Sequence, residues 1–146
     1  MSIEENKALV RRYYEEVLND GRLDVLSDLA VPNYDEHDPL PGQANGLEGL
    51  RQRVEMLRTG LAAHYTIEDV IAERDKVVVR WTNRGRHVGE FLGIPPTGKA
   101  YSIVGIDIIG MRDGEIVETG THAELLKQTD GIYARLWSLQ TDQAAA

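Results

Sequence analysis

The chain has 146 residues, of which 42% are hydrophobic and 27% are charged, and its formal net charge at pH 7 is −8. This composition argues against a disordered chain, and the absence of Cys excludes disulfides, thiolate metal sites and cysteine nucleophiles. The acidic balance argues against a nucleic-acid partner, and no apolar run reaches the roughly 18–20 residues of a membrane span. The N-terminal residues lack the pattern of a signal peptide, so we expect a cytoplasmic protein.

Helical periodicity dominates the first sixty residues. Ser2 and Glu5 form a capping box, and apolar residues then recur at helical spacing until a turn that contains Gly21. A short second helix follows. Residues 32–47 contain three prolines and two glycines, which predicts a long loop of the kind that often carries function. A third helix is expected from residue 47 to residue 61.

The period of the pattern then changes from 3.6 to 2. It predicts strands over residues 65–73, 76–87 and 101–111, and a fourth that begins at Glu115 after the tight turn at Asp113-Gly114. From Thr121 the pattern becomes helical again.

This order of elements indicates an α+β fold that spans residues 1–146 as one domain. We expect N-terminal helices packed on a strongly curved antiparallel sheet, which makes a cone over residues 1–119. A helical C-terminal segment, 120–146, would replace the last strand. The interior of such a cone is the natural site for an apolar small molecule.

Three motifs carry a family resemblance: Gly85-Arg86-His87-x-Gly89, then Gly93-x-Pro95-Pro96-Thr97-Gly98, then Asp113-Gly114-x-Ile116. With them, residues 5–118 resemble the SnoaL-like polyketide cyclases. The resemblance implies the cone-shaped fold of nuclear transport factor 2 and a fused-ring polyketide ester, closed without a cofactor by an intramolecular aldol reaction. The tail after Gly114 resembles instead the C-terminal end of ATP-binding-cassette ATPases, but the chain has no phosphate-binding G-x-x-x-x-G-K-[ST] loop.

The resemblance also marks the positions of the cyclase catalytic residues. The cyclases carry their acid–base Asp on the last strand, where this chain has Thr121. Their Gln and His on the preceding strand correspond to Gly105 and Asp107, and their Asn in the loop after the second helix falls near Glu36. All four positions therefore hold a different residue.

Asp107 is the leading catalytic candidate. Alternation places it on one strand face with Tyr101, Ile103, Gly105 and Ile109, and a carboxylate there is costly unless it is paired, hydrated or protonated. One interpretation is an acid–base or ligand-anchoring group at the floor of the cone. The other is a salt bridge to Arg80, Arg84 or Arg86 on the adjacent strand.

The remaining candidates each have a structural alternative. His87 is a second catalytic candidate, although a hydrogen bond at its strand end is the favoured interpretation. Tyr14 is expected to face the interior of the cone. The alternative is that its ring packs in the hydrophobic core and its hydroxyl makes a hydrogen bond within the protein. Glu36 and His37 could line the mouth of the cone. The ligand-binding set we predict is Tyr14, Glu36, His37, Trp81, Tyr101, Ile103 and Gly105. We expect no metal, because the four His lack metal-ligand spacing, and no cofactor.

Three functions fit these features. The first is a polyketide cyclase-like enzyme, or one of isomerase or dehydratase type, that uses Asp107 as acid and base. The second is a binding protein that keeps the apolar, polycyclic or aromatic ligand without a reaction. The third is a protein-interaction module, because Val104, Ile106 and Ile108 give the sheet an apolar outer face. Cover of that face by the C-terminal segment favours a monomer over the homodimer usual among relatives.

Overall fold

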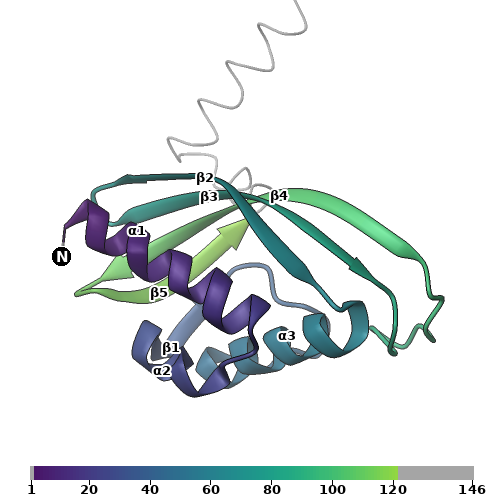
Figure 1. The fold of residues 1–146 in the computed structure, drawn as a ribbon. Coiled ribbons are helices and arrows are strands. Elements are labelled where there is room, and N and C mark those ends of the chain that lie inside the picture. The colour runs from purple at the N-terminus through teal and green to yellow at the C-terminus, as the bar shows by residue number, and fades with distance from the viewer. Residues whose placement is uncertain (1, 122–146) are drawn as a thin grey trace, which may run out of the picture.

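Helices lie against one face of a five-stranded sheet in the computed structural model, which describes residues 2–121 (Figure 1). The helical elements are α1 (Ile3–Arg12), its π-helical continuation η1 (Tyr13–Asn19), the short η2 (Leu23–Val25) and α2 (Leu26–Leu29), and α3 (Gly46–Leu61). The strands are β1 (Ala30–Glu36), β2 (His64–Glu73), β3 (Lys76–Arg86), β4 (Ala100–Arg112) and β5 (Glu115–Thr121). Their order across the sheet is β1-β5-β4-β3-β2.

The first helix begins as the sequence predicts. Ser2 Oγ accepts a hydrogen bond from the backbone N–H of Glu5 at 3.1 Å and donates one to the Glu5 carboxylate at 3.0 Å. Val10, Tyr14 and Val17 recur at helical spacing and are completely buried. The π-helical turn begins at Tyr13, and such turns are frequent at functional sites.

Strands β3 and β4 form the centre of the sheet, in unbroken antiparallel register from Lys76 opposite Gly110 to Arg86 opposite Ala100. The turn between β4 and β5 is the predicted one, since Asp113 and Gly114 both take positive φ (50° and 76°). The α+β class and the four predicted strands are therefore confirmed.

Strand β1 corrects the prediction of a loop over residues 32–47. It occupies the first part of that segment and pairs in parallel with β5, which makes the sheet mixed rather than antiparallel. Pro32 lies inside β1, and a proline is tolerated there because β1 is an edge strand that can spare one backbone N–H. The irregular part of the segment is thus shorter than expected.

Strand β5 also extends further than expected. Gly120 and Thr121 are paired with Ile108 and Asp107 of β4, so the strand continues two residues into the segment predicted to be helical. The rest of the predicted C-terminal helix lies outside the described residues.

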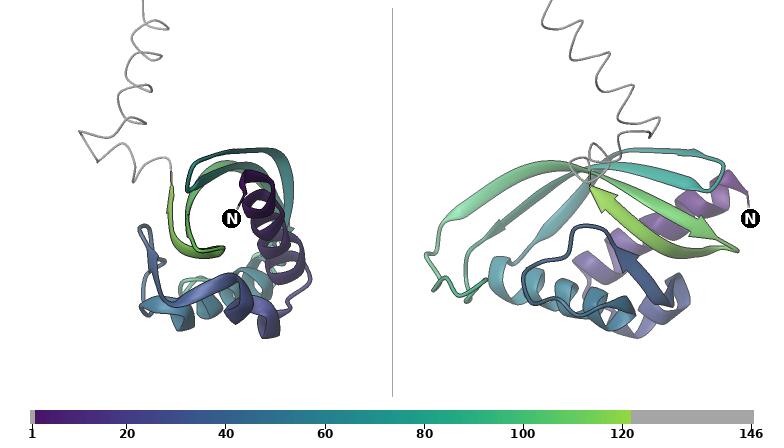
Figure 2. Two further views of the ribbon diagram at one scale, coloured as in Figure 1. Left: turned by 90° about the vertical axis from the view of Figure 1, so that its left-hand side faces the viewer. Right: turned by 180° about the vertical axis from the view of Figure 1, so that it is seen from behind.

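The core lies between the helices and the sheet, and Figure 2 shows α1 and α3 on the same side of the strands. Fully buried side chains come from every layer: Val10, Tyr14, Leu26, Leu29, Leu50, Val54, Val77, Val79 and Ile109. No helix within residues 2–121 is both long and apolar enough to cross a membrane.

Candidate functional site

Asp107 faces the helices from the middle of β4. Its register partner on β3 is Val79, which is completely buried, and Ile109 two residues further along β4 is also buried. The hydroxyl of Tyr14 donates a hydrogen bond to Asp107 Oδ2. The inward orientation predicted for Asp107 and for Tyr14 is therefore observed, and the two residues form a direct pair between η1 and β4.

The predicted alternative for Asp107, a salt bridge to an arginine on β3, is wrong. Arg80 instead donates to Asp69 at 2.8 Å, on an exposed part of the sheet. The reason is alternation: the inward residues of β3 opposite this part of β4 are Val79 and Trp81, while Arg80 points the other way.

The surroundings of the pair shift both pKa values upward. Burial is the largest cause that raises the pKa of Asp107, and the hydrogen bond from Tyr14 opposes it. Burial and then the Asp107 charge raise the pKa of Tyr14. Tyr14 therefore keeps its proton as a donor, and Asp107 is the group of the pair that can gain or release one.

Trp81 contributes a further polar group beside Asp107. Its indole N–H lowers the pKa of Asp107, but the buried nitrogen has no hydrogen bond of ordinary geometry within residues 2–121.

Aromatic rings continue from the pair across the sheet. Tyr13 and Tyr14 pack edge to face with ring centroids 5.3 Å apart, Tyr14 and Tyr65 at 5.8 Å, and Tyr65 and Trp81 at 5.0 Å. The ring of Trp81 rests on the backbone of Gly105, where a Cβ atom would lie 2.4 Å from Trp81 Cζ2. Gly105, a predicted ligand contact, thus makes room for the indole ring.

A second acidic group lies on β1. Glu36 accepts a hydrogen bond from the Tyr34 hydroxyl at 2.6 Å, and burial raises the pKa of its carboxyl against the opposing charge of Arg53. Neither Tyr34 nor Arg53 is among the site residues predicted from the sequence. A signal for Arg53 was present, since it lies between Leu50 and Leu57 on the apolar stripe of α3.

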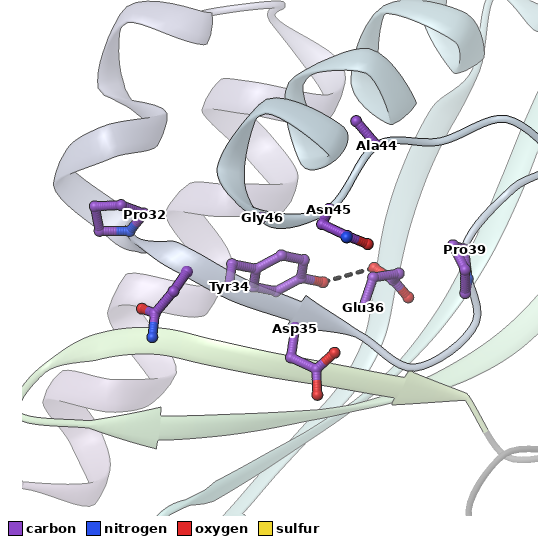
Figure 3. A pocket seen from close by; sticks show the side chains of 9 residues that line it. Pro32, Tyr34, Asp35, Glu36, Pro39, Ala44, Asn45 and Gly46 are labelled. Atoms are coloured by element: carbon purple, nitrogen blue, oxygen red, sulfur yellow. Dashed lines mark hydrogen bonds between the residues drawn. The ribbon is translucent and has the colours of Figure 1, made fainter.

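A pocket of about 590 Å³ opens where β1 passes the N-terminus of α3 (Figure 3). Tyr34 and Glu36 both line it, and Figure 3 shows their hydrogen bond along its wall. The complete lining is Pro32, Asn33, Tyr34, Asp35, Glu36, Pro39, Ala44, Asn45 and Gly46. Of Glu36 and His37, the two residues predicted to line the mouth of the cone, Glu36 therefore lines a pocket.

His37 has a different setting from the one predicted. It lies at the edge between β1 and β5, where its Nε2 is 2.9 Å from Glu118 and 3.6 Å from Asp35. These three side chains bring their ligand atoms within 4.8 Å of one another, as a metal site would. Lys76 already neutralises Glu118 at 2.9 Å, so the group is accounted for as an ion-pair network.

His87 lies beyond the end of β3, eight residues from Val79, the register partner of Asp107. At about 3.3 Å per residue this places it far from the Tyr14–Asp107 pair. Its Nδ1 is 3.2 Å from Thr97 Oγ1 and its backbone bonds Lys99 and Gly98, which matches the structural interpretation.

Two predicted ligand contacts lie on the inward face of β4, nearer its start. Tyr101 donates a hydrogen bond to buried Asn83 at 3.2 Å. Ile103 is opposite Asn83 in the register and is 50% exposed. Both lie toward the end of the sheet where β3 and β4 lead into the long connection between them.

Comparisons with known proteins place these features in a family. The profile of the SnoaL-like polyketide cyclase family matches residues 8–130, beyond the end expected from the motifs. Aklanonic acid methyl ester cyclase AcmA of Streptomyces galilaeus is 34% identical over 115 residues, which cover 77% of this chain and 79% of that protein.

A crystal structure described as a SnoaL-like polyketide cyclase from Jannaschia sp. CCS1 superposes with a TM-score of 0.74 at 26% identity, covering 92% of this chain and 96% of that one. The resemblance to transporter ATPases corresponds to a short match: 51% identity over 41 residues to ABC transporter B family member 19 of Arabidopsis thaliana, which is 27% of this chain and 3% of that protein. The long matches, the fold and the motifs agree, and the chain belongs to the SnoaL-like polyketide cyclase family.

Proposed function

We propose that this protein binds an apolar, polycyclic or aromatic polyketide-like molecule between its helices and its sheet, and that Asp107, held in place by Tyr14, performs acid–base chemistry on it. The observation that carries the proposal is the part-buried hydrogen bond from Tyr14 to Asp107. A carboxylate in an apolar, aromatic setting has a raised pKa, which suits a group that must both accept and return a proton near neutral pH.

The strand register supports this assignment. The cyclase resemblance expects the catalytic Asp at the position of Thr121, and Thr121 is the register partner of Asp107 on the neighbouring strand. Register partners in an antiparallel pair lie on the same face, with Cβ atoms about 4.5–5.5 Å apart. A carboxylate on β4 can therefore serve nearly the same space as one on β5.

The proposed chemistry needs no cofactor. The Asp107 carboxylate takes a proton from a carbon next to a carbonyl, and the resulting enolate carbon attacks a second carbonyl of the same molecule. The proton on Asp107 then passes to the new alkoxide oxygen, so that the enzyme returns to its starting state. Tyr14 keeps its proton throughout and holds the carboxylate in place, and the aromatic side chains exclude water.

Two measurements test the proposal. Exchange of the acidic carbon-bound proton of an aromatic β-keto ester into deuterium oxide, followed by NMR, detects proton removal, and turnover of aklanonic acid methyl ester detects cyclisation. Asp107→Asn should lower both rates by about 10²–10⁴-fold. Asp69→Asn, which removes a carboxylate elsewhere on the sheet, should leave them unchanged. Equal rates in wild type and Asp107→Asn refute the enzymatic role.

A binding protein without turnover is the second candidate. It is favoured by Gly105 and Thr121, because neither position supplies the polar or acidic group that the cyclase resemblance expects there. In that case native mass spectrometry of the purified protein should detect a retained apolar molecule while both rate measurements show no enzyme-dependent signal.

A further inference from the structure

Arg53 carries a half-buried positive charge that no ion pair neutralises within residues 2–121. Its guanidinium Nη1 donates to two neutral oxygens, the Asp38 carbonyl at 3.2 Å and Gln43 Oε1 at 3.4 Å, and no carboxylate of the described residues lies within 4.0 Å of it. Its neighbour Arg51 has Glu48 at 3.6 Å. A half-buried guanidinium that no acidic group contacts directly has unused capacity to bind one.

Gln43 adds a second unused donor at the same place. Its Oε1 accepts hydrogen bonds from the Leu40 backbone N–H at 3.0 Å and from Arg53. The amide oxygen of Gln43 therefore points toward these two donors. The other end, Nε2, is buried and has no hydrogen-bond partner within residues 2–121. Buried donors are nearly always satisfied in folded proteins, so a buried donor without a partner among the described residues can donate to an acceptor on a bound molecule.

The charge of Arg53 acts on the interior around the Tyr14–Asp107 pair. It lowers the pKa values of Tyr13 on η1, Glu36 on β1 and Asp107 on β4. Burial is the largest influence on the pKa of Arg53 and lowers it, but the acidic groups of Glu36, Tyr13, Tyr65 and Asp107 together raise it by more, so the guanidinium stays charged. The charge of the Arg53 guanidinium therefore influences Asp107.

We infer that Arg53 and the Gln43 amide bind an acidic oxygen of the ligand, a carboxylate or an ionised phenol or enol. This inference rests on the proposed function, because it names the class of ligand that the interior receives: an aromatic molecule that carries an ionised acidic group rather than a fully neutral one. The anchored group fixes one end of the molecule and leaves the carbon skeleton for the aromatic side chains and Asp107. The negative charge of Glu36 also interacts with the Arg53 guanidinium, so Glu36 would repel the bound anion and weaken its binding.

A matched pair of probes tests the inference without any turnover. 2-Naphthoate and methyl 2-naphthoate have the same ring system and differ in the negative charge, and isothermal titration calorimetry measures both. The wild type should prefer the acid. Arg53→Gln should weaken the binding of the acid by tenfold or more and change the ester by less than twofold. Glu36→Gln should tighten the binding of the acid.

Arg51→Gln is the matched control, since it removes a positive charge from the same helix beside an existing acidic partner, and it should leave both affinities unchanged. Circular dichroism melts confirm that each variant is folded. Equal weakening of acid and ester by Arg53→Gln, or no binding of the acid by the wild type at millimolar concentration, overturns the inference. Asp107→Asn should keep the preference for the acid, so a failure of the catalytic proposal and a failure of the anion site give different results.

Discussion

Gly105 on β4 lies directly opposite Trp81 on β3. The indole ring of Trp81 fills the space that a side chain at position 105 would occupy. This contact explains why the position that the cyclase resemblance assigns to a polar residue holds none. A large ring has taken the space above the strand, and it closes the aromatic row that begins at Tyr13.

Gly105→Ala should therefore lower the free energy of unfolding by about 1–3 kcal/mol, because the new Cβ would overlap the ring and force it aside. Urea denaturation followed by circular dichroism measures the loss. The double variant Gly105→Ala with Trp81→Leu should be less destabilised than the sum of the two single variants, since the smaller side chain leaves room for the methyl group. Strict additivity would contradict the assigned contact.

The raised pKa of Asp107 makes a pH-dependent contribution to stability. Because the folded protein holds this proton more tightly than the unfolded chain, stability is greatest below the ordinary pKa of Asp and falls as pH rises through the raised folded value. Tyr14, Trp81 and Arg53 reduce the shift, and Asp38 adds to it.

Asp107→Asn should lack this loss of stability. The difference in unfolding free energy between the variant and the wild type should grow in favour of the variant as pH increases above about 4. Urea titrations at a series of pH values measure it. If the difference in unfolding free energy between variant and wild type did not change with pH, the Asp107 carboxyl would have the same pKa in the folded and unfolded protein.

Tyr14→Phe removes the hydrogen bond that favours the charged form of Asp107, so the pKa of the carboxyl should rise further. A hydrogen bond to a charged group contributes about 1.5–3 kcal/mol, so the rate of proton exchange should fall by roughly 10–100-fold at neutral pH. The acidic limb of the pH–rate profile should move to higher pH. An unchanged profile would mean that the pair has no role in the reaction.

The outer face of the sheet allows a prediction about assembly. Val104 is 76% exposed and Ile71 is 65% exposed within the described part of the chain. We expect a monomer in light scattering, and Val104→Asp should leave the mass unchanged. A dimer that dissociates on this substitution would show that a second copy covers the face.

Periodicity was sufficient to predict the inward face of β4. Alternation placed Asp107 beside Ile109 and away from Val104, and the register with Val79 agrees. Helical spacing likewise placed Tyr14 inward. These inferences succeeded because each depends only on local geometry that every strand or helix shares.

Strand β1 could not be predicted in the same way. Pro32, Asn33 and Asp35 are poor strand formers, and their strand exists because β5, distant in the sequence, supplies its hydrogen bonds. The pairing of Asp107 with Tyr14 could not be predicted either. Alternation shows which face of the strand a carboxylate occupies, but not which side chain from another element contacts it. Arg53 was overlooked because a single charge on an apolar stripe is ordinarily discounted as a solvated side chain.

The parallel pairing of β1 with β5 has a consequence for synthesis of the protein. It joins residues more than eighty positions apart, so a chain emerging from the ribosome carries Tyr14, Glu36 and α3 long before the strand that holds β1 in place. Until Glu115 and the residues after it are exposed, one edge of β4 and the backbone of β1 have no partners. The nascent chain therefore gains its β1 wall, with Tyr34 and Glu36, only after β5 has been synthesised, and a ribosome stalled before β5 would hold a sheet with an open edge.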